Sequence, residues 1–114
     1  MKVVITGDRN WTDRGKIRDR LSLLPPGSTV IVGGCRGADQ LAEEEAYKLG
    51  NTIILIRADW ATYGRAAGPI RNGWMLDEEP DLVLAFHPNL AESKGTADCV
   101  RQARKRGIPV EHIP

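Results

Sequence analysis

Short apolar runs alternate with longer amphipathic stretches along the 114 residues of the chain. The runs are rich in valine, isoleucine and leucine and contain few polar residues, which is typical of strands buried on both faces of a parallel sheet. The pattern predicts five strands, at residues 2–6, 29–32, 52–56, 81–86 and 110–113.

The amphipathic stretches between these runs have the spacing of helices. In residues 38–49, for example, Leu41, Ala42, Ala46 and Leu49 recur at the spacing of one helical face. Glycine or proline follows each stretch as a stop signal, and Pro69 suits a first helical position. The pattern predicts four helices, at residues 16–24, 38–49, 70–76 and 96–106.

Strands and helices therefore alternate from one end of the chain to the other. This order favours a mainly parallel five-stranded sheet with helices on both faces, joined by right-handed crossovers. We expect a small, doubly wound, Rossmann-like α/β fold. Residues 1–114 contain no internal repeat, linker or low-complexity tract, and their number suits a single domain.

The loops that follow the strands carry the candidate chemistry. In a doubly wound fold these loops gather at the carboxyl edge of the sheet, where ligands bind. Each contains glycine and at least one cation, whereas the opposite connections look like plain turns. The loops are residues 7–11, 33–39, 59–72 and 87–96.

Two of these loops predict a phosphate site. Glycines precede the helices that begin near Ala38 and Thr96, and the first turn of a helix presents free N–H groups and a partial positive charge to an anion. Arginine and lysine stand nearby, so a nucleotide-like ligand is expected. The candidate ligand-binding residues are Gly7, Arg9, Gly33, Gly34, Arg36, Gly37, Asp39, Arg71, Asn72, Gly95 and Thr96, with Arg65 and Lys94 as further cations.

Several of these residues also have a purely structural interpretation, and both readings stay open. Glycines after a strand permit tight packing, Asp39 suits the first turn of a helix, and Thr96 suits an N-cap. Trp11 and Trp60 are candidates for stacking on a base, or are core residues.

Composition and charge narrow the classes of function. Sixteen basic and fifteen acidic residues give a net charge of +1, which disfavours nucleic-acid binding, and the basic residues 101–106 read as a solvated helix end. Cys35 and Cys99 are far apart and form no CxxC pair, so we expect neither a metal site nor a disulfide but reduced thiols in a cytoplasmic protein. No segment approaches the length that spans a membrane, and no cofactor is expected.

Together these loops resemble the SLOG superfamily, and most closely its small single-domain YspA-like branch. The resemblance covers nearly the whole chain and implies a Rossmann-like fold and a nucleotide or nucleotide-derived ligand. The segments that carry it are GDRNW at 7–11, GGCRGAD at 33–39, DW at 59–60, YGRAAGPIRN at 63–72 with Met75, and GTAD at 95–98.

The superfamily includes the LOG-type phosphoribohydrolases, which release a base from a nucleoside monophosphate. Their Arg-Lys-x-x-Met segment resembles Arg71-Asn72-x-x-Met75, and their Gly-Gly-x-Gly-Thr-x-x-Glu segment resembles the stretch around Gly95-Thr96. Cys99 stands at the position of the glutamate. Asp98 is its neighbour, but one residue along a helix turns a side chain by about 100°.

Three hypotheses of function follow. We favour a module that binds or senses a phosphorylated nucleotide-like ligand. A catalytic function needs its acid–base group in place, and this sequence has Cys99 at the position of the expected glutamate. The alternative is a nucleotide N-glycosidase, with Arg71 orienting the phosphate and Asp98 or Asp39 as the acid–base group. Nucleic-acid binding through the last helix is a third and disfavoured function.

The resemblance to LOG-type enzymes also implies a homodimer. The predicted helix at residues 70–76 carries Trp74 and Met75, which either form an apolar contact face or belong to the core of the monomer.

Overall fold

The computed structural model describes residues 1–114 and contains one five-stranded sheet in which all strands are parallel. The strand order is β3-β2-β1-β4-β5. This arrangement confirms the predicted Rossmann-like α/β fold. The strands are β1 (Lys2–Gly7), β2 (Thr29–Val32), β3 (Thr52–Leu55), β4 (Leu82–Phe86) and β5 (Val110–Ile113).

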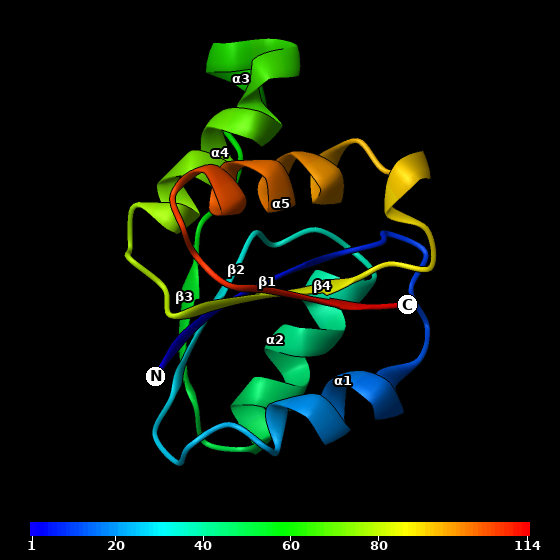
Figure 1. Ribbon diagram of the computed structural model, residues 1–114, viewed down its shortest axis with the longest axis vertical. Coiled ribbons are helices and arrows are strands. Elements are labelled where there is room, and N and C mark those ends of the chain that lie inside the picture. The colour runs from blue at the N-terminus through cyan, green and yellow to red at the C-terminus, as the bar shows by residue number, and fades with distance from the viewer.

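Helices cover both faces of the sheet (Figure 1). Helices α1 (Arg14–Leu21) and α2 (Ala38–Lys48) pack together below the sheet in this view. Helices α4 (Ala67–Leu76) and α5 (Gly95–Lys105) pack together above it. The longest helices, α2 and α5, have 11 residues each, and none of the helices could span a membrane.

Alternate residues of the strands pack against the two helical layers. Val3 and Ile5 of β1 lie in the cluster that contains α1 and α2, whereas Val4 lies in the cluster that contains α4 and α5. Because both faces of the sheet are covered, the central strands β1, β2 and β4 carry apolar residues at most of their positions. This explains why the runs in the sequence show no polar alternation.

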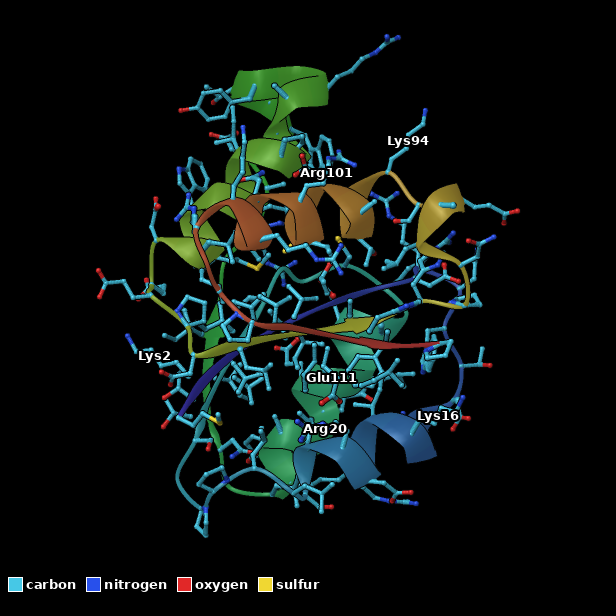
Figure 2. All side chains as sticks on the ribbon, in the orientation of Figure 1. Lys2, Lys16, Arg20, Lys94, Arg101 and Glu111 are labelled. Atoms are coloured by element: carbon cyan, nitrogen blue, oxygen red, sulfur yellow. The ribbon has the colours of Figure 1, made fainter.

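Ion pairs at the protein surface tie α1 to its neighbours. Arg14 Nη1 lies 2.8 Å from Glu45 Oε2 of α2, and Arg20 Nε lies 2.7 Å from Glu111 Oε2 of β5. Arg20 and Glu111 point toward one another in Figure 2. These contacts hold α1 against α2 and β5 and belong to the framework, although Arg14 also borders a groove beside the loops after β1 and β2.

Helices α2 and α5 lie within one residue of their predicted bounds at each end, and the other predicted helices need larger corrections. Helix α4 begins at Ala67, so Pro69 lies within its first turn, where a missing N–H group does no harm. The preceding segment, which has no helical periodicity, forms the short helix α3 (Trp60–Tyr63) and a 3₁₀ turn at 64–66. Helix α1 occupies 14–21 and not 16–24. A further 3₁₀ turn at 90–92 was not predicted.

The strand order determines where the loops meet. The chain moves outward from β1 through β2 to β3, and then returns to place β4 on the other side of β1. The carboxyl ends of β1 and β4 therefore flank the switch point, which is the usual ligand crevice of a doubly wound sheet.

Candidate functional site

A groove of about 390 Å³ lies at this switch point and is lined only by polar residues and glycine. The loops after β1 and β4 form most of it, and the loop after β2 adds Arg36. The lining residues are Gly7, Asp8, Arg9, Asn10, Arg36, His87, Glu92, Ser93, Lys94, Gly95 and Thr96.

Three exposed cations border the groove without an ion-pair partner in the chain. They are Arg9, Arg36 and Lys94, and none lies within 4.0 Å of a carboxylate. Lys94 extends outward from the loop before α5 (Figure 2). Asp8 and Glu92 lie in the same lining, so the groove carries three basic and two acidic side chains.

The N-terminus of α5 forms one wall of the groove and is capped by Ser93. Ser93 Oγ accepts hydrogen bonds from the backbone N–H groups of Thr96, at 3.0 Å, and Ala97, at 3.2 Å. Thr96 itself lies inside the first turn and is buried, so its interpretation as an N-cap is wrong. Gly95 has open space around its Cα.

The N-terminus of α2 packs directly on the loop after β1. The backbone N–H of Ala38 donates to the carbonyl oxygen of Asp8 at 3.0 Å. Gly37 has φ +77°, and a Cβ there would collide with the carbonyl oxygens of Asp8 and Arg9. Glycine at this position therefore lets the first and second strand loops come together.

A smaller cavity of about 60 Å³ lies beneath the groove and shares Gly7, Arg9, Gly95 and Thr96 with it. Its remaining lining residues come from β1, the loop after β2, and helices α2 and α4. They are Thr6, Cys35, Asp39, Arg71 and Asn72. The fold thus brings eight of the eleven predicted ligand-binding residues to the two connected spaces.

Arg71 enters this cavity from α4 and is 8% exposed. Its Nη1 donates to the carbonyl oxygen of Gly33 at 2.8 Å, and its Nε donates to Asn72 Oδ1 at 3.2 Å. A Cβ on Gly33 would lie 2.6 Å from the guanidinium carbon, so only glycine leaves room for Arg71. This burial excludes a role for Arg71 in an exposed surface ion pair.

Asp39 faces the same cavity from α2 and is 6% exposed. The only hydrogen bond that its carboxylate accepts within 3.5 Å comes from the backbone N–H of Cys35, at 3.4 Å. Burial raises the pKa of Asp39 to about 6, although the positive charge of Arg71 opposes this shift. A carboxyl group with a perturbed pKa in a cleft is a candidate functional group.

Asp98 does not line the cavity. Its Oδ2 accepts hydrogen bonds from Asn72 Nδ2 at 3.0 Å and from Gln102 Nε2 at 2.8 Å. Arg101 lies 3.7 Å from its other oxygen. These contacts give Asp98 a positioning role toward Asn72, and the carboxylate that reaches the cavity belongs to Asp39.

The two cysteines differ in their environment. Cys99 is fully buried, and burial raises the pKa of its thiol to about 12. Cys35 is partly exposed and its Sγ lies 3.8 Å from Arg71 Nη2. Both are free thiols, and no cluster of three histidine, cysteine or acidic side chains is placed to hold a metal ion.

The remaining predicted site residues lie outside the two spaces. Trp11 packs its ring edge-on against Phe86 at 5.7 Å and donates from Nε1 to the carbonyl oxygen of Asp13, although it borders a neighbouring groove. Trp60 lies on α3, beyond α4 in Figure 1, and is 52% exposed. Gly33, Gly34 and Gly37 line neither space, although Gly37 borders the same neighbouring groove as Trp11.

Sequence reasoning missed Thr6, Ser93 and Cys35 as site residues. Thr6 is the last side chain of β1 before the glycine, and this position at the carboxyl end of a strand was the available signal. Ser93 precedes the N-terminus of a helix by two residues, a spacing that the sequence alone does not distinguish from that of Thr96.

The fold also occurs in a solved structure of DNA processing protein A (DprA) from Streptococcus pneumoniae. The two superpose with a TM-score of 0.78 at 16% sequence identity, over 99% of this chain and 50% of the DprA chain. This chain thus spans about half the length of DprA, and the likeness concerns the fold alone.

Sequence comparison identifies nearer relatives. The Gene 61 protein of Mycobacterium phage D29 is 42% identical over an alignment of 118 residues, which covers 96% of this chain and 93% of the phage protein. The model of the YspA, cpYpsA-related SLOG family, called YAcAr, matches residues 1–63, which include the loops after β1 and β2. The chain therefore belongs to the YspA, cpYpsA-related SLOG family.

Proposed function

We propose that this protein binds a nucleotide or nucleotide-derived phosphorylated ligand at the carboxyl edge of its sheet. The observation that carries this proposal is the polar groove at the switch point, with three cations that have no ion-pair partner in the chain. Membership of the SLOG family supports a nucleotide-related function.

The phosphate group is assigned to the space between Arg9, Arg36 and Lys94. Guanidinium groups bind phosphate oxygens through paired, charge-assisted hydrogen bonds, and a lysine adds a further positive charge. At the N-terminus of α5, the hydroxyl oxygen of Ser93 accepts hydrogen bonds from two backbone N–H groups. The partial positive charge of that helix end favours a negatively charged oxygen beside it.

The base is assigned to a neighbouring open groove of about 560 Å³. This groove shares Arg9, Asn10 and Arg36 with the phosphate groove, so one ligand can occupy both. Trp11 and Leu41 are its apolar lining residues. An apolar edge beside polar groups is the usual composition of a site for a heterocyclic ring.

A nucleotide N-glycosidase is the second candidate function, and Asp39 is the observation that favours it. Its carboxylate faces the cavity beside Arg71. Cleavage of an N-glycosidic bond needs a carboxylate to activate water and to stabilise positive charge on the sugar, as in glycoside hydrolysis. Asp98 is a weaker candidate because Asn72 and Gln102 already hold its carboxylate.

One experiment distinguishes the two functions. The protein is incubated with nucleoside monophosphates and NAD-derived nucleotides, its melting temperature is measured, and chromatography detects released base. Stabilisation without base release supports the binding module. Base release that is lost in Asp39→Asn and Arg71→Ala supports the hydrolase. If no nucleotide changes the melting temperature and none is cleaved, the proposed function is wrong.

A further inference from the structure

We propose that the cavity beneath the groove binds the sugar hydroxyls of the ligand, so that the protein prefers ribonucleotides to 2′-deoxyribonucleotides. This inference rests on the proposed function, because it assumes that the phosphate lies in the groove above. It adds a selection between ribose and deoxyribose, which a phosphate site alone cannot provide.

The first observation is that two buried, opposite charges share the cavity without forming an ion pair. Asp39 and Arg71 are each more than nine-tenths buried and both line the cavity. No nitrogen of Arg71 lies within 4.0 Å of a carboxylate oxygen. Buried charges are normally paired, because leaving water is costly for each of them.

The second observation is that both groups have unused hydrogen-bonding capacity. Asp39 accepts one long hydrogen bond, from Cys35 N. Arg71 uses Nε and Nη1 for Asn72 and Gly33, and its Nη2 meets only the sulfur of Cys35, which is a weak acceptor. An acceptor and a donor therefore face the same small space.

The chemistry of the walls selects the group that fits between them. An anion is repelled by the carboxylate of Asp39, and a cation is repelled by the guanidinium of Arg71. A hydroxyl group donates to the first and accepts from the second. The cavity of about 60 Å³ has room for about two hydroxyl-sized groups, since a water molecule occupies about 30 Å³ in the liquid.

The groove and the cavity are connected, and this connection determines which part of the ligand reaches the cavity. Gly7, Arg9, Gly95 and Thr96 line both the groove and the cavity. A phosphate bound above by Arg9 therefore leaves the attached sugar directed toward the cavity. Neighbouring hydroxyls on one edge of a ribose ring match two hydroxyl-sized positions between Asp39 and Arg71.

The test compares ligands that differ by one hydroxyl. Calorimetry measures the affinities of ribose 5-phosphate and 2-deoxyribose 5-phosphate, and of 5′-ribonucleotides of four bases with their 2′-deoxy counterparts. We expect each ribose ligand that binds to do so about tenfold more tightly, since a hydrogen bond to a charged group contributes that much. Equal affinities overturn the inference and indicate a cavity that holds water only.

A variant pair assigns the preference to the cavity. Asp39→Asn keeps the size of the side chain but removes the charge, so we expect it to weaken ribose ligands toward the affinity of their deoxy counterparts and to leave the deoxy ligands unchanged. Glu43→Gln is the matched control, because Glu43 lies on the same helix as Asp39 and lines neither groove nor the cavity. Equal weakening of both ligand types in Asp39→Asn contradicts the inference.

The same measurements separate this inference from the proposed function. If both ligand types bind and Arg36→Ala weakens both, the proposed phosphate site is supported. The ratio of the ribose and deoxyribose affinities then tests the sugar preference alone. If no phosphorylated ligand binds, the proposed function fails, and the inference fails with it.

Discussion

The carboxylate of Asp39 is buried, so little water is available to stabilise its negative charge. Burial raises its pKa from 3.8 to about 6, even though Arg71 and Arg9 attract its negative charge. The folded state therefore holds a proton that the unfolded chain has already released between about pH 4 and pH 6. Over this interval Asp39 lowers the stability of the fold as the pH rises, and the loss remains at neutral pH.

Replacement of this carboxylate by an amide tests the argument. Asp39→Asn should raise the free energy of unfolding at pH 7.5 by about 2–3 kcal/mol, the free energy that corresponds to a shift of about two pKa units. The gain should disappear near pH 4, where Asp39 is protonated in both states. Urea denaturation at the two pH values measures it, and a variant that is less stable at pH 7.5 contradicts this account.

Gly33 is required because Arg71 occupies the space of its missing side chain. Gly33→Ala should lower the free energy of unfolding by about 1–3 kcal/mol, since the buried guanidinium has to move. Gly68→Ala is the matched control, because a Cβ there meets only Trp60 at 3.6 Å. Urea denaturation compares the two variants, and equal effects would show that Arg71 moves freely.

At the scale of elements, the strands were predictable from the sequence and the short helices were not. Three strands differ from their predicted bounds by one residue and two match, because burial on both faces leaves a strong local signal. Helix α3 has four residues and is held by Asp59, whose Oδ1 accepts from Thr62 N at 3.1 Å. Such a turn depends on one cap and leaves no periodic pattern.

The cap of α5 is a local contact, between Ser93 and the N–H groups three and four residues further along the chain. Ser93→Ala removes the oxygen that accepts from two first-turn N–H groups, so the free energy of unfolding should fall by about 1 kcal/mol. Thermal and urea denaturation measure the change. Ser22→Ala serves as the comparison. The hydroxyl of Ser22 is exposed and donates to the carbonyl oxygen of Asp19 at the C-terminal end of α1, where it caps no N–H group. No loss in Ser93→Ala would contradict the assigned cap.

At the scale of the whole molecule, the topology accounts for most of what could be predicted about the site. Parallel strands bring the loops to one edge, and so glycine and arginine in those loops were sufficient to predict where the candidate site lies. The approach of Asp39 to Arg71 was not predictable, because it depends on how α2 and α4 pack on opposite faces of the sheet. The direction of Asp98 toward Asn72 depends instead on how α4 and α5 pack together on one face of the sheet.

The homodimer implied by the resemblance stays a prediction, and the structure alters its proposed surface. Met75 is buried in the core and is unavailable, whereas Trp74 is 37% exposed and lies 6.0 Å from the ring of Tyr63. Light scattering should give twice the chain mass of 12.5 kDa, and Trp74→Asp should return the monomer. Tyr47→Asp, on α2, is the control. A wild-type monomer at high concentration would exclude the dimer.

The central claim is that the groove between β1 and β4 binds a phosphorylated ligand, and calorimetry with matched ligand pairs tests it most directly. The wild type should bind at least one 5′-ribonucleotide and not the corresponding nucleoside. Arg36→Ala should weaken this binding about tenfold or more, because we propose that its guanidinium binds the phosphate. Arg104→Ala, an exposed arginine outside the groove, should have no effect. Equal binding of nucleotide and nucleoside, or equal affinities of the two variants, would contradict the account.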